Sequence, residues 1–353
     1  MVVPAQQSTS VGTLAELRQL EAERHASATV HGRSTPGDLG GGLYVFDAQL
    51  ASQDNDASSI VPAAEGGTWR LVTSGPVSAA VFGNLADDVG AAVLLAQESG
   101  YHRLLLPDGE WQQRTPIVVR QPLTLTSSAS RTTFGVTAAR IVKHGDFPHV
   151  DAHVQFNSLG IEYEGNRTNL RADAGSADLV LRVRGEFYGV IQRQPGNGIE
   201  LLVQSEAHNL NGMVLAGASN NNGGNGLLVA DSNSPWSPDT NNIYSPYFKT
   251  KGNDKHGVVF QTGLYPRFYF LQADTNGGHG LFSLCSGPVK ASFFSVYAEG
   301  NSSPINVAAS CGGAFSDNVF VSSGPNVHSR DLRPHDGNLL ILGRLGNTGI
   351  WPR

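Results

Sequence analysis

The stretch Lys251–Phe260, KGNDKHGVVF, overlays Asp274–Ser283, DTNGGHGLFS, at an offset of 23 residues. Asn222–Val229, NGGNGLLV, fits the same template at an offset of 31, and Val296–Glu299 overlays Leu271–Asp274 at an offset of 25. The offset of 31 exceeds the offset of 23 by eight residues, which is about the size of the turn-rich loop 231–238. A unit of 23–25 residues that ends in Asn/His-Gly-aliphatic is the size of one coil of a parallel β-helix. In such a fold the turn asparagines stack from coil to coil.

Three Asn-Gly pairs test this repeat. Asn197-Gly198, Asn211-Gly212 and Asn225-Gly226 are spaced by 14 residues, which is short for a full coil of this kind. A single Asn-Gly pair is most simply a hairpin turn. Because several pairs are in phase, the pattern favours a solenoid, and one of the three pairs is expected to mark a turn in the middle of a coil.

The composition agrees with a fold built of strands and turns. Glycine takes 42 of the 353 positions and charged residues take 15 %. A disordered chain is richer in charge, and a helical bundle needs far more Ala, Glu, Lys, Leu and Arg. Asparagine is concentrated in the second part of the chain, with 21 residues after position 150 and only Asn55 and Asn84 before it. The first part therefore reads as mixed α and β, and the second as short strands.

Charge and hydropathy limit the partners. The net charge is −6, and no run of lysine and arginine is suited to a row of phosphates, so nucleic acid is not expected. No apolar run is long enough for a membrane span, and residues 1–10 lack a signal core. We expect synthesis in the cytoplasm without export by the usual secretory route. Cys285 and Cys311 are too few for a disulfide framework, and the sequence indicates no cofactor.

The N-terminal segment predicts a compact α+β unit. Thr13-Leu14-Ala15-Glu16 is a capping-box pattern at the start of a short helix. Strands are predicted over 43–47 and 68–72, Val81-Phe82-Gly83 reads as a strand end, and residues 87–99 form an apolar helix closed by Gly100. A strand over 103–106 follows and stops at Pro107.

Two motifs in this order resemble known families. Val81–Gly83, Asp87-Asp88, the helix 91–96 and the run LLLPDGEW at 104–111 resemble the entry to pectate-lyase-like right-handed parallel β-helices, in which a helix caps the solenoid. Upstream, GGGLY at 40–44 and GGTWRL at 66–71 resemble the particle-attachment region of bacteriophage tailspikes. One departure is that Asn84-Leu85-Ala86 replaces the usual Gly-Asp-Gly loop before the paired aspartates. The two resemblances cover roughly residues 11–111.

The resemblance implies an all-β, right-handed parallel β-helix with a small N-terminal α+β attachment domain. We expect an attachment domain over 1–75, coils over 76–330 with a capping helix near 87–99, and a C-terminal strand and trimerisation segment over 331–353. It also implies a homotrimeric virion spike, on tail or head, attached to particle proteins through residues 1–75. Such a spike binds, and in some cases cleaves, a bacterial capsule or O-antigen. The alternatives are a non-enzymatic adhesion spike and a secreted polysaccharide lyase.

The repeat stacks three charged residues on successive coils, namely Lys251, Asp274 and Glu299. Adjacent coils lie about 4.8 Å apart, so the two carboxyls are expected roughly 5–9 Å apart, a range that covers both classes of glycosidase pair. In that hypothesis one carboxyl protonates the leaving oxygen, the other is nucleophile or base, and Lys251 orients substrate or lowers a neighbouring pKa. The alternative is a solvated charged column that stabilises the stack.

Other charged residues give weaker hypotheses. Glu162 and Glu164 point the same way on a strand and are either paired acids or part of an exposed strand face. His256 and His279 lie one above the other, as metal ligands or, more simply, as turn residues that bond backbone. Arg267 is available for a lyase, but no aspartate cluster surrounds it. No metal site is predicted.

Aromatic residues mark a sugar-binding region in the later coils. Sugar rings stack their C–H faces on aromatic rings, and amide side chains satisfy the hydroxyl groups. The alternative is packing of these rings beneath loops or at a subunit interface. The predicted set is Trp236, Tyr244, Tyr247, Tyr265, Phe268 and Tyr269, of which all but Phe268 are assigned to substrate binding.

Overall fold

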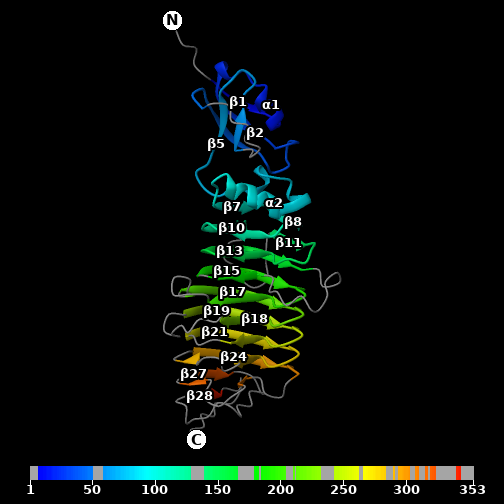
Figure 1. The fold of residues 1–353 in the computed structure, drawn as a ribbon, viewed down its shortest axis with the longest axis vertical. Helices are drawn as coiled ribbons and strands as arrows, with labels where there is room; N and C mark the ends of the chain where they lie inside the picture. The colour runs from blue at the N-terminus through cyan, green and yellow to red at the C-terminus, as the bar shows by residue number, and fades with distance from the viewer. Residues whose placement is uncertain are drawn as a thin grey trace.

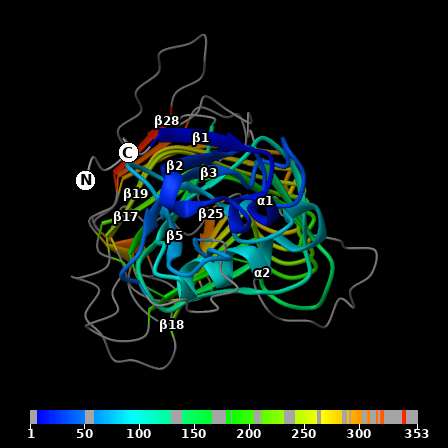
Figure 2. The same cartoon turned by 90° about the horizontal axis from the view of Figure 1, so that it is seen from above.

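Most of the chain winds into a stack of coils, with the N-terminal segment at one end and the C-terminal strands at the other (Figure 1). The computed structural model describes residues 7–50, 59–128, 139–165, 179–182, 184–203, 210, 212–231, 242–261, 265–283, 289–290, 293–302, 307–309, 315–316, 319–322 and 339–342. Viewed along the stack, the coils overlie one another around a shared interior (Figure 2).

Two parallel sheets carry the coils in the described part of the chain. The larger sheet has 13 strands and follows the order β28-β27-β24-β21-β19-β17-β15-β13-β10-β7-β6, with β11 and β8 paired beside β13. Its strands are β6 (Val77–Ser78), β7 (Arg103–Leu106), β8 (Gly109–Gln113), β10 (Leu123–Ser127), β11 (Ala139–Lys143), β13 (Phe156–Glu164), β15 (Gly185–Gln192), β17 (Met213–Asn220), β19 (Asn242–Lys251), β21 (Tyr265–Asp274), β24 (Phe293–Glu299), β27 (Val319–Ser322) and β28 (Leu339–Leu342).

The second sheet has eight strands in the order β25-β22-β20-β18-β16-β14-β12-β9. They are β9 (Ile117–Val119), β12 (Val150–Ala152), β14 (Leu179–Leu181), β16 (Ile199–Val203), β18 (Leu227–Asp231), β20 (Val258–Phe260), β22 (Leu281–Ser283) and β25 (Val307–Ala309). A parallel pair, β23 (Val289–Lys290) with β26 (Phe315–Ser316), lies apart from both sheets. Side chains alternate along each strand, and the inward set forms one apolar core that includes Phe187, Leu215, Phe248 and Phe260.

Stacked asparagines hold the turns between the two sheets. The Nδ2 atom of Asn222 donates to Asn253 Oδ1 at 2.8 Å, Asn253 donates to Asn276 at 2.8 Å, and Asn276 donates to Asn301 at 2.9 Å. These links span 31, 23 and 25 residues, which are the offsets that the sequence repeat predicts. The parallel β-helix and its coil length are therefore confirmed.

The pairs spaced by 14 residues are also explained. Asn225 Nδ2 donates to Asn197 Oδ1 at 3.0 Å across 28 residues, so these two asparagines belong to successive coils. Gly212, with φ of +81°, lies directly before β17 and at a different place in the coil. The expectation of one turn in the middle of a coil is therefore confirmed at residue 212.

The long strands of the large sheet each bend partway along. The pairing register shifts between Leu159 and Ile161, between Val214 and Ala216, and between Phe268 and Leu271. Gly160 fills the shift in β13 with φ of +73°, a conformation that favours glycine. In β21 the same place holds Tyr269 and Phe270, two consecutive exposed aromatic residues. The bend of β21 therefore presents two consecutive aromatic rings to solvent.

The N-terminal unit is a five-stranded sheet with order β1-β2-β3-β5-β4, in which β1 and β2 are parallel and the other pairs antiparallel. Its elements are β1 (Gln7–Val11), α1 (Leu14–Arg18), η1 (Ala22–Arg24), β2 (His25–Val30), β3 (Gly42–Asp47), β4 (Ile60–Pro62) and β5 (Thr68–Val72). Thr13 Oγ1 caps α1 by accepting from Glu16 N at 3.3 Å. The Glu16 carboxylate accepts from Gly12 N rather than from Thr13 N, which is one residue away from the capping-box prediction.

Helix α2 (Leu85–Glu98) packs on the first coils, with Asn84 at its start and Gly100, at φ of +83°, after its end. Asp88 has non-helical dihedral angles within α2 and binds the first coil. Its Oδ1 accepts from Arg114 N at 3.0 Å, and its Oδ2 from Thr115 Oγ1 at 2.6 Å. The prediction of a strand end at Val81–Gly83 is wrong: residues Ala79–Val81 form the short helix η2, capped by Ser78. No helix in the described ranges has the length and apolarity needed to cross a bilayer.

Candidate functional site on the outer face of the large sheet

Lys251, Asp274 and Glu299 occupy one register position on β19, β21 and β24. Lys251 pairs with Asp274, and Asp274 pairs with Glu299, across parallel strands. The same column continues to Asn220 on β17 and Gln192 on β15. The stacking that the sequence predicts is therefore present in the backbone, while the Glu299 side chain lies outside the described atoms.

Next to this column, the bend of β19 and β21 carries a patch of exposed aromatic side chains. Tyr244 is 45 % exposed and Tyr269 is 49 % exposed, and their ring centroids lie 5.3 Å apart. Tyr247 stacks on Phe270 with centroids 5.4 Å apart and planes 13° apart. We call these four residues the aromatic patch. Planar apolar faces held open to solvent on adjacent coils are suited to stacking against sugar rings.

A chain of polar contacts joins the aromatic patch to the column. Tyr247 Oη donates to Gln272 Oε1 at 3.4 Å, and Gln272 Nε2 donates to Asp274 Oδ2 at 2.5 Å. Burial and the nearby Asp274 charge raise the pKa of Tyr247 to about 12, so its hydroxyl keeps its proton at neutral pH. Asp274 Oδ1 is buried and has no hydrogen-bond partner in the described structure.

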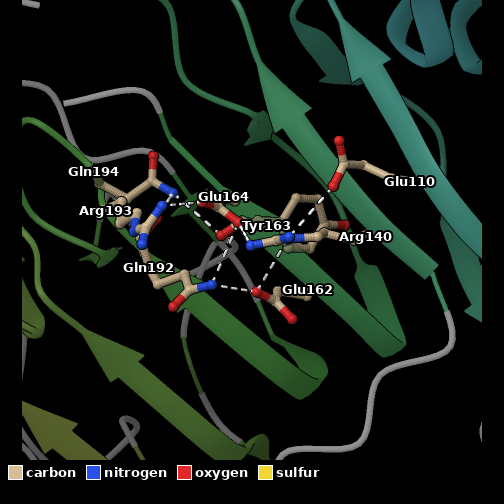
Figure 3. A network of polar contacts seen from close by, with 8 residues as sticks. All are labelled: Glu110, Arg140, Glu162, Tyr163, Glu164, Gln192, Arg193 and Gln194. Atoms are coloured by element: carbon tan, nitrogen blue, oxygen red, sulfur yellow. Dashed lines mark hydrogen bonds and ion pairs between the residues drawn. The ribbon is translucent and has the colours of Figure 1, made fainter. Parts of the chain in front are cut away.

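A second polar cluster lies on the earlier coils of the same sheet (Figure 3). Arg140 on β11 contacts Glu110 through Nη1 at 3.3 Å and Glu162 through Nε at 3.4 Å. Its third guanidinium nitrogen, Nη2, contacts Glu164. Arg193 donates to Glu164 Oε1 at 2.9 Å. Gln192 donates to Glu162 and, at 3.4 Å, to Glu164. We call these residues the arginine–glutamate network.

The arginine–glutamate network corrects the expectation of an exposed strand face at 162–164. Glu164 is 7 % exposed and holds both arginines, while Glu162 is half-buried. Glu164 accepts a hydrogen bond from the charged Arg193, while Glu162 accepts one from Gln192 and forms an ion pair with Arg140, so both carboxylates are held in fixed positions. Sequence reasoning picks out the Glu-x-Glu spacing, but Arg140 lies on another coil and at no fixed offset in the repeat. The signal for the arginine partner is therefore absent from the local sequence.

The structure places the other predicted residues as follows. Trp236 and the Tyr265 side chain lie outside the described atoms, and Arg267 is exposed at the far end of β21. Phe268 faces the core and is fully buried, so its assignment to the aromatic region is wrong. Phe270 takes its place on the outer face and is missed by the sequence, because the register shift at the bend turns two consecutive residues outward.

The two histidines stack as predicted. Their rings lie 5.3 Å apart with planes 3° apart, and His256 Nδ1 accepts from His279 N at 2.9 Å. Burial, with the neighbouring His279 and Lys255 charges, lowers the pKa of His256 to about 4. A ring nitrogen occupied by a backbone amide is not free for a metal, which favours the structural interpretation. The described residues contain no group of three or more metal-ligating side chains.

A cavity of about 650 Å³ lies between loop 33–38 and helix α2. Its carboxylates already have partners. Asp38 accepts from the backbone amides of Arg33, Ser34 and Thr35 and from Gly40, while Asp88 binds the first coil. Burial raises the pKa of Asp38, but these backbone hydrogen bonds outweigh it and leave the pKa lowered. The polar groups in this cavity therefore hold loops in place.

The fold and the outer face define the class: a parallel β-helix whose coils are capped by a helix and preceded by a small β-sheet domain. Residues 10–74 match the family model described as the phage tail protein small four-stranded beta-sheet domain. A search of curated protein sequences found no match for the chain. The resemblance to bacteriophage tailspikes and pectate-lyase-like parallel β-helices is confirmed by this family match together with the solved structures of similar fold.

Three solved structures illustrate that fold. WceF of Pantoea stewartii, described as a glycan biofilm modifying enzyme with a bacteriophage tailspike-like parallel β-helix fold, is 14 % identical, with a TM-score of 0.56 over 96 % of this chain and 51 % of its own. The tailspike protein of Acinetobacter phage vB_ApiP_P1 is 10 % identical, with a TM-score of 0.55 over 95 % of this chain and 70 % of its own.

Tailspike protein 2 of an Escherichia coli O157:H7 bacteriophage is 13 % identical, with a TM-score of 0.50 over 89 % of this chain and 46 % of its own. The chain thus spans about half the length of the first of these structures. At these identities the likeness is one of fold, and the chain has the tailspike-like parallel β-helix fold.

Proposed function

We propose that this chain is a spike on the surface of a phage or phage-like particle that binds a bacterial surface polysaccharide. Residues 1–75 attach it to particle proteins, residues 76–330 present the coils, and residues 331–353 serve trimer assembly. The family match over 10–74 supports the attachment role, and the tailspike-like fold supports the spike. Capsule and O-antigen are the polysaccharides proposed as ligands.

The observation that carries polysaccharide binding is the aromatic patch. Three of the seven large apolar residues that are exposed in the described structure, Tyr244, Tyr269 and Phe270, gather on two adjacent strands. Exposed aromatic residues clustered on a rigid sheet mark an interaction surface more strongly than scattered ones. Amide and hydroxyl groups of Gln272 and Tyr247 lie beside the rings and are suited to sugar hydroxyls. The patch therefore offers both stacking and hydrogen bonding.

Binding is tested by titrating the purified full chain against an array of bacterial capsular and O-antigen polysaccharides. The variants are Tyr244→Ala and Tyr269→Ala, each expected to weaken retention roughly two- to tenfold, because one aromatic stacking contact contributes on the order of 0.5–1.5 kcal/mol. The matched control is Tyr188→Ala, an outward-facing tyrosine on β15 of the same sheet. Unchanged retention by both patch variants would contradict the assignment.

The register of Asp274 and Glu299 favours a second activity, hydrolysis of the bound polysaccharide. The backbone positions of Asp274 and Glu299 pair on neighbouring coils, about 4.8 Å apart along the stack, a spacing compatible with a pair of glycosidase carboxylates. In this second function one carboxyl donates the proton to the leaving oxygen and the other is nucleophile or base, with Lys251 beside them. The alternative role of these three residues is a charged column that only stabilises the stack of coils.

Cleavage is tested by incubating the chain with each polysaccharide it retains and measuring chain length by size-exclusion chromatography. The double variant Asp274→Asn with Glu299→Gln is expected to abolish shortening while retention persists. Shortening that survives in the double variant would remove these residues from the chemistry. Retention with no shortening by the unaltered chain would establish an adhesion spike.

A further inference from the structure

Two lysines on the outer face of β19 lie beside the aromatic patch. Lys249 and Lys251 alternate with the buried Thr250, so both ammonium groups face outward, with their Cα atoms roughly 6.6 Å apart. We infer that this site recognises an anionic sugar, whose carboxylate or phosphate group binds Lys249 and Lys251. This inference rests on the proposed polysaccharide binding and adds the charge of the ligand.

Neither lysine has an ion-pair partner among the described residues. Asp274 lies directly across from Lys251 in the register, yet its Oδ2 is held by Gln272 and its Oδ1 is turned into the protein. Lys249 is moreover half-buried, and lysine is rarely taken out of water without a partner. The partner for the Lys249 charge is therefore expected to come from a ligand, and the exposed Lys251 lies within reach of the same ligand.

The arginine–glutamate network on the same face provides the internal comparison. There, Arg140 and Arg193 are both matched by carboxylates at ion-pair distance. The charges of these two arginines are thus neutralised within the protein. The unmatched pair occurs two coils away, at the place where the exposed aromatic residues also occur.

Room for a ligand is provided by short side chains on the adjacent strand β17. Ala218 pairs with Lys249, and Ala216 pairs with Tyr247. Between them, Gly217 has φ of +126°, and a Cβ atom there would lie 1.8 Å from the carbonyl oxygen of Gly189. Glycine is therefore required by the close approach of the two strands. On β17 the residues that pair with Tyr247 and Lys249 are therefore alanines, and Asn220 pairs with Lys251.

The aromatic patch and the two lysines together specify the class of ligand. A neutral polysaccharide needs aromatic faces and amides, which the patch supplies without the lysines. Two outward ammonium groups within reach of one sugar unit add charge-assisted hydrogen bonds to an acidic group, which are stronger than neutral ones. Carboxylate-bearing sugars, such as uronic acids, and phosphate-bearing sugars share this chemistry.

The test uses the full chain and the array of capsular and O-antigen polysaccharides described above, sorted by acid content. Retained polysaccharides are expected to be anionic, and retention to weaken when the salt concentration rises from 0.05 to 0.5 M, on the order of a tenfold loss. Reduction of the carboxyl groups, or removal of phosphate with hydrofluoric acid, is applied to each retained polysaccharide. Whichever treatment abolishes retention identifies the acidic group.

The variants are Lys249→Gln and Lys251→Gln, singly and together, with Lys255→Gln on the neighbouring turn as a matched control. The double variant is expected to lose at least tenfold in affinity for the anionic polysaccharide, and Lys255→Gln to bind as the unaltered chain does. Retention of a neutral polysaccharide, or retention that survives both chemical treatments, overturns the inference while leaving the proposed binding intact. If no polysaccharide is retained, the proposed function itself fails.

Discussion

Asn253 donates a 2.8 Å hydrogen bond from Nδ2 to Asn276 Oδ1, one coil further along the stack. The same Nδ2 also donates to Ser219 O at 3.1 Å, and Asn253 Oδ1 accepts from Asn222 N at 3.1 Å and from Asn222 Nδ2 at 2.8 Å. Asn253 is fully buried at the junction of the two sheets. Its side chain therefore satisfies groups on the coil before it and the coil after it.

Replacing Asn253 with alanine is expected to lower the free energy of unfolding by about 2–4 kcal/mol, because buried donors and acceptors on two neighbouring coils lose their partners. The measurement is urea denaturation followed by circular dichroism. Asn220→Ala is the control, since Asn220 lies outward on β17 and its Oδ1 accepts no hydrogen bond in the described structure. Equal losses in the two variants would argue against a stabilising ladder.

Asp88→Ala is expected to loosen helix α2 from the first coil. The carboxylate holds the amides of Gly90, Arg114 and Thr115 and the Thr115 hydroxyl, so its removal leaves several donors without partners and costs about 2–3 kcal/mol. Amide hydrogen exchange at residues 114 and 115 is expected to accelerate. Asp87→Ala, which removes a carboxylate that accepts from Asn84 Nδ2, is expected to leave exchange at these two amides unchanged.

Lys143 is buried in the first coils, where its Nζ donates to Phe147 O at 2.8 Å. Burial lowers its pKa to about 7, although Asp146 partly opposes the shift. Its other titratable neighbour, His149, is fully buried. Burial, and to a smaller extent the Lys143 charge, lowers the pKa of the His149 ring well below its usual value. The unfolded chain binds the lysine proton up to its ordinary pKa of 10.5, while the folded chain releases it near pH 7.

Between those two pH values the unfolded state holds more protons, so stability is expected to rise with pH, by up to about 1.4 kcal/mol per pH unit from this group. Below pH 7 both states are protonated and this contribution becomes constant. Thermal denaturation from pH 7 to 9.5 measures the slope. Lys143→Met is expected to flatten it, and an equal slope in the variant would show that other groups cause the dependence.

The proposed trimer predicts a mass in solution of three times the 37.3 kDa of one chain. Light scattering coupled to size-exclusion chromatography measures this mass without a shape assumption. A removal of residues 331–353 is expected to lower the mass to that of one chain, whereas removal of residues 1–75 is expected to leave the trimer intact. A full-length monomer would contradict the proposed assembly.

The repeat is the part of this fold that sequence predicts best. Asn-Gly and His-Gly turns recur, and an aliphatic run follows each of them. The backbone at a coil junction admits few other residues. The position of each coil can therefore be recognised from the local sequence. Once the phase is known, the stacking of Lys251, Asp274 and Glu299 follows, because a strand side chain changes face with every residue. The asparagine ladder follows in the same way.

Residues outside that phase are harder to predict. The bend of β21 turns Tyr269 and Phe270 outward and Phe268 inward, which simple alternation along the strand does not show. The partner of Glu164 is Arg140, from a coil without an Asn-Gly marker, so no spacing connects the two residues in sequence. At Val81 an apolar pair beside glycine is compatible with strand or helix, and the Ser78 cap decides for the short helix η2.

The unequal length of the coils has a consequence for how such a molecule changes over generations. Asn222 and Asn253 are 31 residues apart and Asn253 and Asn276 only 23, yet both pairs form the same hydrogen bond. Sequence inserted between the strands of one coil therefore leaves the junction of the next coil unaltered. New segments can be gained or exchanged on the flank of the stack as self-contained modules. In the proposed spike, a lineage that meets a new host surface can alter its reach without first rebuilding its scaffold.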